Sequence, residues 1–473
     1  MGHKEACLQV YGRRKGSSGA DMNLSVTRHH DQFLGGTAKP GMSSRRGSGG
    51  LWSAINTMLS VAFIALLIVW QWGFAVLPVA AALTASVGFI ATLGRCLARL
   101  DREDGLLLLA LLVFSGVWLA DVSRSGVWPL PQGGDGGWLP LWPLLAAGLL
   151  VWLRGYPPSQ RGWLLGLLAA SLGAGLIAGY ERGWVGLPRA NNSMNAIPFG
   201  NLALLFGVLS LVAMLGRLGS SRCRARWLTV LLGVAACAGL AASLLSGTRG
   251  GWIALPLLSW LLYRNFRPLL PARFLWAAFG VLGGLLILAV CLPQTGVAAR
   301  LLLAVDNVRG YYMAGETATS LGLRLEMWRG GLALFTDRPV TGWGEGGLEA
   351  ARDARVAAGE LSRGVSDYDQ LHSDFIDTAA RRGTLGVISL VGLYGVPLLL
   401  FSRHLRSARR AWQRTLALSG VVIVAAFIDF GLSQSLLRDP RGLAGYLGLC
   451  IICWALLKAE TSPRSTVSAL ESP

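Results

Sequence analysis

His372 lies in the polar run 369–377, Asp-Gln-Leu-His-Ser-Asp-Phe-Ile-Asp, at the end of the one long polar loop in an otherwise apolar chain. An imidazole titrates near neutral pH, so it can accept a proton from a reacting hydroxyl. A titratable side chain at a membrane surface is a candidate for function. Of the five histidines, this one alone is predicted on the outer side of the membrane, whereas a tail or a cytoplasmic loop holds the others, His3, His29, His30 and His404.

Arginines predicted on the same side indicate the chemistry that would accompany the histidine. Arg249 stands between glycines in the short connection 246–252, and Arg182 and Arg189 lie in another connection. Guanidinium is planar, stays charged and donates two parallel hydrogen bonds, which suits a diphosphate. Each arginine alone could instead reach the lipid interface or cap a helix. A shared side favours a binding role for the set as a whole, which is Arg182, Arg189, Arg249, Arg324, Arg438 and Arg441.

Carboxylates crowd His372 in the sequence. On a helix Asp369 would precede the histidine by one turn, where it could orient the imidazole or raise its pKa. Asp369 is therefore also a candidate substrate contact. The alternative is that Asp367, Asp369, Asp374 and Asp377 hold a divalent cation together with the histidine.

The composition indicates how these residues are positioned. Hydrophobic residues make up 53% of the 473 residues, charged residues make up 14%, and the mean hydropathy is +0.50, which indicates a membrane protein. Apolar runs of roughly 17 to 25 residues predict transmembrane helices. We find twelve, centred near Ile64, Thr84, Leu112, Ala146, Ser171, Phe206, Ala235, Leu257, Gly283, Val391, Ile423 and Leu449. The predicted fold is all-α, with about 12 transmembrane helices and one long periplasmic loop between the ninth and the tenth.

The distribution of arginines predicts the orientation, because short cationic loops tend to stay in the cytoplasm. Five alternate loops together hold seventeen arginines, and the four short loops on the other side hold six. Both tails are also basic, which requires an even number of spans. The net charge of +18 is thus a topology signal and an attraction to anionic lipid, and no basic module for nucleic acid is predicted.

The predicted organisation has five parts. Residues 1–50 form a disordered basic cytoplasmic tail, residues 51–292 hold the first nine spans, and residues 293–372 form the periplasmic loop with the catalytic motif. Residues 373–460 hold the last three spans, and residues 461–473 form a second cytoplasmic tail.

The long loop is predicted to fold. Three segments space apolar residues by three or four, which favours short amphipathic helices over the mouth of the bundle: 297–313, 320–335 and 346–358. The glycine-rich break 337–347 separates the last two segments. Trp343 and Gly344 in this break are candidate substrate contacts, because glycine permits close approach of the backbone to a ligand.

Three motifs follow one another between the seventh and the tenth predicted spans. They are Ser-Gly-Thr-Arg-Gly-Gly at 246–251, then Arg-Leu-Glu-Met-Trp at 324–328 continuing to Phe-Thr-Asp-Arg-Pro-Val-Thr-Gly-Trp-Gly-Glu-Gly at 335–346, then His-Ser-Asp-Phe at 372–375 followed by Arg-Gly-Thr-Leu-Gly at 382–386. In this order and topology the motifs resemble the O-antigen ligase and O-antigen polymerase superfamily of bacterial inner-membrane proteins.

The resemblance implies a function and a place. It implies a glycosyltransferase that moves O-antigen polysaccharide from undecaprenyl diphosphate to a sugar hydroxyl of lipid A-core, which completes lipopolysaccharide, without a metal or another cofactor. It implies a multi-pass protein of the bacterial inner membrane whose active site faces the periplasm. A histidine and two arginines essential to transfer match His372, Arg249 and Arg324. The family commonly has asparagine after the histidine, and Ser373 stands there in this chain, so the part of a second amide donor stays open.

The residues and the resemblance together predict one mechanism. Arg249 and Arg324 would bind the diphosphate and stabilise the charge that develops on the leaving oxygen. His372 would take the proton of the acceptor hydroxyl, and attack opposite the leaving group would invert the anomeric centre. Arg182 and Arg189 would bind further phosphates of the carrier or of the lipid A-core.

Other functions would fit part of the same pattern. An O-antigen polymerase or a protein O-oligosaccharyltransferase of the superfamily would differ only in the acceptor. A transporter of a lipid-linked glycan belongs to another class, and two features count against it. The charged loop lies on one face, and no pair of broken spans repeats between the two halves of the sequence.

Overall fold

A computed structural model describes residues 44–129, 138–219, 226–248, 250–252, 255–291 and 297–461. Within these ranges the chain forms helices and no strand, which confirms the predicted all-α class. The chain divides into residues 1–46 and a second unit, 47–473, which holds nearly all of the described residues. Both predicted tails, 1–50 and 461–473, lie outside the described ranges except for residues 44–50 and residue 461.

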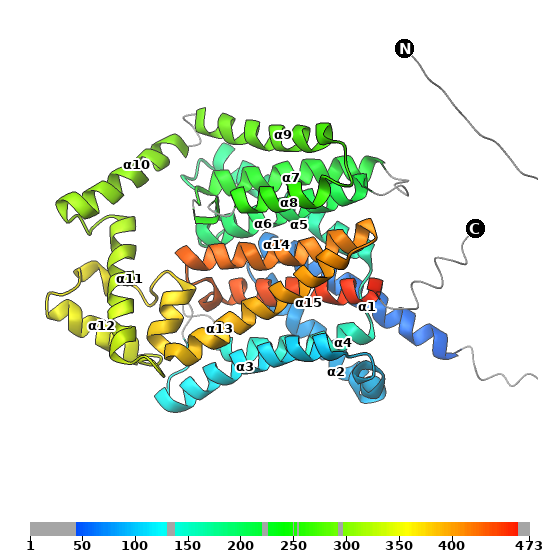
Figure 1. Cartoon of the computed structure of the whole chain (residues 1–473), viewed down its shortest axis with the longest axis horizontal. Helices are drawn as coiled ribbons and strands as arrows, with labels where there is room; N and C mark the ends of the chain where they lie inside the picture. Colours follow the sequence, from blue (N-terminus) through cyan, green and yellow to red (C-terminus); the bar gives the residue numbers. More distant parts are fainter. Residues whose placement is uncertain are drawn as a thin grey trace, which may run out of the picture. The chain divides into compact units, whose positions relative to one another are not determined.

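Among the residues that the structure describes, eight helices are long and apolar enough to cross a membrane. They are α1 (Ser44–Val69), α3 (Arg102–Ser125), α5 (Gln160–Gly183), α6 (Ala196–Leu218), α7 (Arg226–Ser246), α13 (Asp374–Ser407), α14 (Ala411–Ser433) and α15 (Pro440–Thr461). Most of these helices lie side by side, roughly horizontal in Figure 1. Each of the eight contains one of the predicted span centres.

The other four predicted spans coincide with apolar helices that are not among these eight. These helices are α2 (Gly73–Leu97), α4 (Trp142–Gly155, after the 3₁₀ turn η1, Leu139–Leu141), α8 (Leu255–Phe266) and α9 (Ala272–Cys291). α8 has 12 residues. Such a helix rises about 18 Å at about 1.5 Å per residue, which is less than the hydrocarbon core of a bilayer. The described part of the chain therefore confirms a multi-span bundle and leaves the count of twelve unconfirmed.

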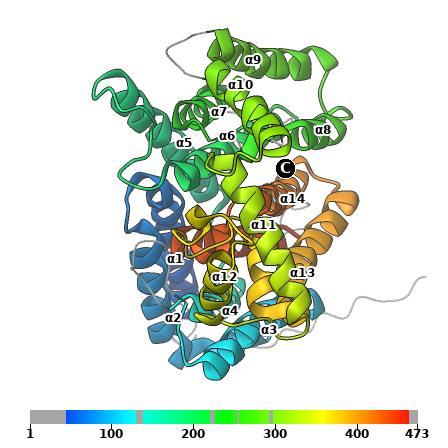
Figure 2. The ribbon, with the colours of Figure 1, turned by 90° about the vertical axis from the view of Figure 1, so that its left-hand side faces the viewer.

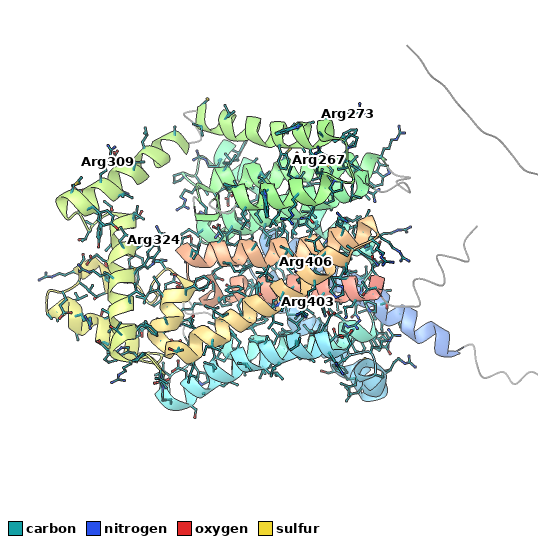
Figure 3. The ribbon with its side chains drawn as sticks, in the orientation of Figure 1. Arg267, Arg273, Arg309, Arg324, Arg403 and Arg406 are labelled. Carbon is teal, nitrogen blue, oxygen red and sulfur yellow. The ribbon has the colours of Figure 1, made fainter. Side chains whose placement is uncertain are left out.

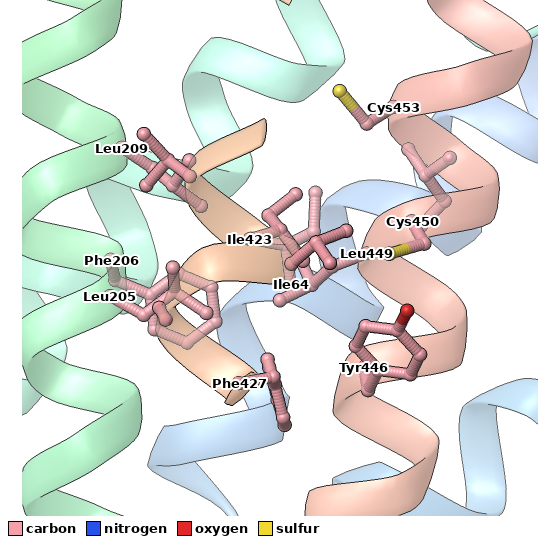
Figure 4. Packing of buried hydrophobic residues seen from close by; sticks show 14 of the residues in the cluster. Ile64, Leu205, Phe206, Leu209, Ile423, Phe427, Tyr446, Leu449, Cys450 and Cys453 are labelled. Atoms are coloured by element: carbon pink, nitrogen blue, oxygen red, sulfur yellow. The ribbon is translucent and has the colours of Figure 1, made fainter. Parts of the chain in front are cut away.

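Three helices form the interior of the bundle. In α6, α14 and α15, 94%, 83% and 89% of the residues in the apolar stretch of the helix are buried, against 33% in α1. Helices that are apolar all round belong in such an interior. Figure 4 shows them meeting α1 through Ile64, Leu205, Ile423 and Leu449, and Cys450 of α15 lies in the same core.

The segment between α9 and α13 forms a helical layer at one end of the bundle. It contains α10 (Val297–Arg309), the π-helical turn η4 (Gly310–Ala314), α11 (Ser320–Asp337), α12 (Gly347–Ala357) and the 3₁₀ turn η5 (Arg363–Val365). Figure 1 shows α10, α11 and α12 beyond the left-hand ends of the membrane helices, and Figure 2 faces this layer. The three predicted amphipathic helices are confirmed, with α10 and η4 together forming the first.

The layer has a small core of its own, which is continuous with α13. It consists of Met327, Leu334, Leu348, Val365, Leu371 and Ala380. Because Ala380 belongs to α13 and Leu371 precedes His372, this core fixes the layer against the start of α13.

Candidate active site

His372 lies where the helical layer meets the membrane bundle, two residues before α13. Its backbone is left-handed, with φ of 50°, and the residue is only 8% exposed. A residue other than glycine adopts this conformation rarely, and neighbouring contacts must hold it there. On one side, Trp328 Nε1 donates a hydrogen bond of 3.1 Å to the carbonyl of Leu371. On the other side, the N–H of Ser373 donates to Ser435 Oγ over 3.1 Å.

The imidazole of His372 is oriented by Gln434, the residue that follows α14. His372 Nδ1 lies 2.9 Å from Gln434 Oε1, and the ring of Tyr368 packs edge-on against the imidazole at 5.1 Å. An amide oxygen only accepts, so Nδ1 carries the proton and Nε2 keeps its lone pair. This tautomer is the one that leaves a nitrogen free to act as a base.

The environment also sets the charge of His372. Burial lowers the pKa of His372, the hydrogen bond that the ring donates to Gln434 opposes that shift, and the positive charge of Arg324 lowers the pKa further. Asp377 and Asp369 raise it to a lesser extent. The net shift is downward, so the imidazole is neutral at pH 7 and can accept a proton.

Asp369, predicted to orient the imidazole of His372 or to raise its pKa, is among the charges that raise this pKa, but it does not precede the histidine on a helix. Residues 366–373 are irregular, so the helical spacing on which that interpretation depended is absent. The carbonyl oxygen of Asp369 accepts a hydrogen bond of 2.5 Å from Arg381 Nη2. The sequence analysis missed Gln434, which is 62 residues from His372. The only sequence signal for it was its predicted place in an outer loop next to Arg438.

Arg324 lies in the first turns of α11 at the same end of the bundle, where its charge acts on His372. Trp328 stands one helical turn further on and contacts the residue before His372, so this side of α11 faces the histidine. Figure 3 shows Arg309 and Arg324 at this end, and shows Arg267, Arg273, Arg403 and Arg406 toward the other end. The structure thus brings two of the three predicted catalytic residues together.

Arg249, the third, lies outside the described residues, but the residues on both sides of it are placed. Thr248 Oγ1 donates a hydrogen bond of 2.8 Å to the carbonyl of Ala196. Gly250 opens the 3₁₀ turn η2 (Gly250–Trp252) and packs so closely on Ser433 that a Cβ would overlap its hydroxyl. Since Gln434 follows Ser433, Gly250 lies against the helix end that orients His372.

Arg182 and Arg189, predicted to bind phosphates, contact backbone carbonyls near the ends of α5 and α7. Arg182 Nη1 donates to the carbonyl of Leu187 over 2.6 Å. Arg189 Nε donates to the carbonyl of Ser246 over 2.8 Å. Arg189 therefore ties the α5–α6 connection to the segment that leads to Arg249, and both arginines hold their loops in shape.

Trp343 and Gly344, predicted to touch substrate, lie where the glycine-rich segment joins α13. The N–H of Trp343 donates to the carbonyl of Ala380 over 3.0 Å, and the N–H of Gly344 donates to the carbonyl of Arg381 over 2.8 Å. Trp343 Nε1 donates to the carbonyl of Leu334 over 2.9 Å. These N–H groups all donate to backbone carbonyls of the protein, so the segment supports the start of α13, which follows His372.

α13 is interrupted to receive this segment. Gly383 has φ of 60° and ψ of −156°, which breaks the helix, and the N–H of Thr384 donates to the carbonyl of Pro339 over 2.7 Å. A Cβ on Gly383 would overlap the backbone of Val340. The second and third sequence motifs therefore contact each other. We call this contact, between residues 339–344 and residues 380–385 of α13, the joint.

A buried ion cluster stabilises the joint, and the sequence analysis did not predict it. Glu345, almost fully buried, accepts hydrogen bonds from Arg381 Nη1 at 3.1 Å and from Arg438 Nη1 at 2.7 Å. Arg382 Nη2 donates to the same carboxylate. Burial alone would raise the pKa of Glu345, but the three guanidinium groups hold it well below its usual value. One anion thus joins the segment 335–346, α13 and the 3₁₀ turn η6 (Leu436–Arg438).

The carboxylates after His372 turn toward protein partners. Asp374 Oδ1 accepts from the N–H of Leu437 over 2.9 Å, and Asp377 Oδ1 accepts from Arg381 Nε over 2.6 Å. Ser373 donates its hydroxyl to the carbonyl of Gly431 over 3.3 Å. Among the described residues no three His, Cys, Asp or Glu side chains gather as a set of metal ligands, and the aspartates near His372 form no such set.

Comparison with known proteins matches the part of the chain that contains this site. Residues 238–391 match the family model described as O-antigen ligase. The chain carries an O-antigen ligase family domain. This domain runs from the later part of α7 into α13, and it includes Arg249, Arg324 and His372. The match confirms the resemblance stated from the motifs for this part of the chain, and it supports glycosyl transfer at a membrane as the general function.

A relative extends the similarity over most of the chain. A protein of Haemophilus influenzae described as uncharacterized is 23% identical over 403 residues, which cover 84% of this chain and 97% of that protein. Gln434, Arg182 and Arg189 lie outside the O-antigen ligase domain, so their part in the site depends on the geometry described above.

Proposed function

We propose that this protein is an inverting, metal-independent glycosyltransferase that moves O-antigen polysaccharide from undecaprenyl diphosphate to a sugar hydroxyl of lipid A-core at the periplasmic face of the inner membrane. The observation that carries the proposal is the state of His372. It is a buried imidazole, its pKa is lowered, and Gln434 holds its Nδ1 while Arg324 acts on it. A neutral base beside a fixed cation is the combination that this transfer needs.

The proposed reaction is a single displacement. His372 Nε2 takes the proton of the acceptor hydroxyl while that oxygen attacks the anomeric carbon. The bond between the anomeric carbon and the diphosphate oxygen breaks, and its electron pair leaves with undecaprenyl diphosphate. General-base catalysis of this kind contributes about 10²- to 10⁴-fold in rate.

Arg324 and Arg249 are proposed to bind the diphosphate. Negative charge increases on the leaving oxygen as the bond breaks, and positioned guanidinium groups stabilise it. After burial, the charge of Arg324 is the main influence that lowers the pKa of His372, so the same residue is proposed to favour the neutral base and to stabilise the leaving group.

His372→Ala tests the base. In cells that make O-antigen, we expect lipopolysaccharide without O-antigen and accumulation of the full-length glycan on its lipid carrier. His404→Ala is the matched control, because His404 pairs with Glu103 of α3, far along α13 from His372. Short, unpolymerised chains in the His372 variant would assign the protein to the polymerases. Normal lipopolysaccharide in that variant would refute the role of His372.

Arginine variants test the diphosphate site. Arg324→Lys and Arg249→Lys should impair transfer nearly as much as the alanine variants, because lysine cannot donate the two parallel hydrogen bonds of arginine. Arg309→Lys, an exposed change in the same layer, should retain transfer. Purified transfer from a defined donor to lipid A-core should also persist in a chelator. Transfer to a protein hydroxyl instead, or transport without transfer, would overturn the assignment.

A further inference from the structure

The helical layer contains a pocket that lies beside α11 and has no part in the proposed reaction. Its volume is about 500 Å³, and it is lined by the turn η4, by α11 and by the segment 359–362. Its main polar and aromatic side chains are Tyr311, Tyr312, Thr317, Glu326, Arg329 and Glu360. Polar groups at fixed positions in a concave pocket set the orientation of a bound ligand.

The floor of this pocket is a buried carboxylate whose partners are all in place. Glu326, only 3% exposed, accepts a hydrogen bond of 2.8 Å from Tyr311 Oη and one of 3.0 Å from Arg329 Nη2. The N–H of Ser362 also donates to Glu326 Oε2, over 3.3 Å. A satisfied buried network of this kind is rigid. The pocket is therefore preformed, and its shape depends on Glu326.

The rim of the pocket combines an aromatic ring with hydroxyl groups. Tyr312 is 71% exposed, and its ring stands perpendicular to that of Tyr311 with 5.2 Å between the centroids. The hydroxyls of Thr317 and Ser362 lie 3.1 Å apart and also line the pocket. A sugar ring has one apolar C–H face and a border of hydroxyl groups, which matches an exposed tyrosine face beside donors and acceptors.

The π-helical turn η4 produces this arrangement. Gly310–Ala314 carry the two tyrosines, and Gly315, with φ of 66°, ends the turn. π-Helical turns are rare and often occur at functional sites. An ordinary continuation of α10 would place residues 311 and 312 about 100° apart on the helix surface without closing the chain back over Glu326.

The position of the pocket relative to His372 follows from α11. Arg324 and Trp328 face the histidine, and Glu326 is two residues from each, so it lies on the opposite side of the helix. The two sites are separated by about one helix diameter, on the order of 10 Å. A polysaccharide that reacts at His372 could pass around α11, with a later sugar in this pocket.

We propose that this pocket binds a neutral saccharide, as a subsite for a part of the glycan that is remote from the reacting sugar. The proposal rests on the proposed function insofar as that glycan is the substrate. The charges favour a neutral ligand over an acidic one. Two carboxylates, Glu326 and Glu360, line the pocket with one guanidinium, Arg329, which already donates to Glu326 and to the carbonyl of Glu360.

Direct binding tests the pocket without any need for transfer. The probe is neutral O-polysaccharide released by mild acid from the lipopolysaccharide of the producing strain, titrated onto the purified full-length protein in nanodiscs and followed by saturation-transfer NMR. We expect Tyr312→Ala to weaken binding roughly threefold to tenfold, whereas Tyr312→Phe keeps the ring and the affinity. Met313→Ala is the matched control, because Met313 is 88% exposed and next in sequence but does not line the pocket.

A transfer assay then separates this proposal from the proposed function. With a long-chain donor, Tyr312→Ala should raise KM and leave kcat unchanged, and with a donor of one repeat unit it should change neither. Unchanged polysaccharide binding in Tyr312→Ala and also in Glu326→Gln would overturn the saccharide site, even if transfer by the wild type is normal. Tighter binding of an acidic polysaccharide than of the neutral one would equally overturn it. Loss of probe binding in Tyr312→Ala would support the site even if the acceptor proves to be other than lipid A-core.

Discussion

The hydrogen bond between His372 Nδ1 and Gln434 Oε1 determines which nitrogen of the ring is free. Without an acceptor at Nδ1 the imidazole could exchange tautomers and rotate, and Nε2 would no longer point reliably toward the acceptor hydroxyl. Burial then keeps the ring neutral by lowering its pKa. Because the base must be unprotonated, we expect transfer in the wild type to decline only as the pH falls below about 6.5.

Gln434→Glu should shift this dependence. A carboxylate against Nδ1 stabilises the protonated imidazole and so raises the pKa of His372. Since transfer requires the neutral ring, the acidic limb of kcat/KM against pH should move to higher pH. The measurement is the pH–rate profile of the purified enzyme with a defined donor and acceptor.

Gln434→Leu provides the contrast. It removes the acceptor without adding charge, so kcat should fall, on the order of 10²-fold for a misplaced base, and the acidic limb should not move upward. Gln71→Glu, the same change at an exposed turn, should leave the profile as it is. An unshifted limb in Gln434→Glu would mean that His372 is not the group that titrates.

Residue type made some site residues predictable from the sequence and left others hidden. His372 and Arg324 were predicted because an imidazole and a guanidinium each indicate a chemical task. Gln434 has no such signature, and its role comes from a contact across 62 residues that no local spacing reveals. Asp369 was predicted from helical spacing, which fails because His372 has a left-handed backbone.

At the scale of elements, the break in α13 is what holds the glycine-rich segment behind the site. The N–H of Thr384 and the carbonyl of Arg381 lie on either side of Gly383, and both bond to the segment 339–344. An unbroken helix would use these groups internally. The motif Arg-Gly-Thr-Leu-Gly is visible in the sequence. The break of α13 at its first glycine could not be predicted, because the segment that bonds there lies some forty residues away.

Gly383→Ala should destabilise the protein. Its backbone angles are accessible almost only to glycine, at a cost of about 1–3 kcal/mol for another residue, and a Cβ would also overlap Val340. We expect a lower melting temperature in detergent and loss of transfer. Gly392→Ala in the same helix is the control, because its Cβ would meet no atom within 4 Å. Equal melting temperatures for the two variants would contradict this account of the joint.

Glu345→Gln should also destabilise the joint, by another route. Arg381, Arg382 and Arg438 would keep their charges in a buried place with no anion shared between them, and breaking a buried pair in this way costs about 3–5 kcal/mol. The measurement is again the melting temperature. Glu349→Gln should cost much less, because Glu349 is partly exposed and pairs with Arg381 alone. If the two variants were equally stable, the cluster would not hold the joint together.

At the scale of the whole molecule, hydropathy predicted where helices occur better than how far they extend. Every predicted centre lies in a helix, because an apolar run in lipid must satisfy its backbone hydrogen bonds internally. The length of a helix was less predictable: α8 is 12 residues long, although the hydropathy of its sequence predicts a transmembrane helix. Neighbouring helices decide how much of an apolar run faces lipid, and a hydropathy window does not contain that information.

Orientation is the remaining property of the whole molecule that the proposed function requires. After the break at Gly383, α13 continues without interruption over residues 384–407. These residues form about 36 Å of helix at about 1.5 Å per residue, which is enough to cross the ~30 Å hydrocarbon core, so the two ends of this part emerge on opposite sides. Ala357→Cys in α12 and Ser407→Cys at the far end of α13 are both exposed. In a variant without the seven native cysteines, a membrane-impermeant maleimide added to intact spheroplasts should label residue 357 at once. Residue 407 should be labelled only after the membrane is disrupted. The reverse pattern would place His372 in the cytoplasm, where a glycan already exported to the periplasm could not reach it.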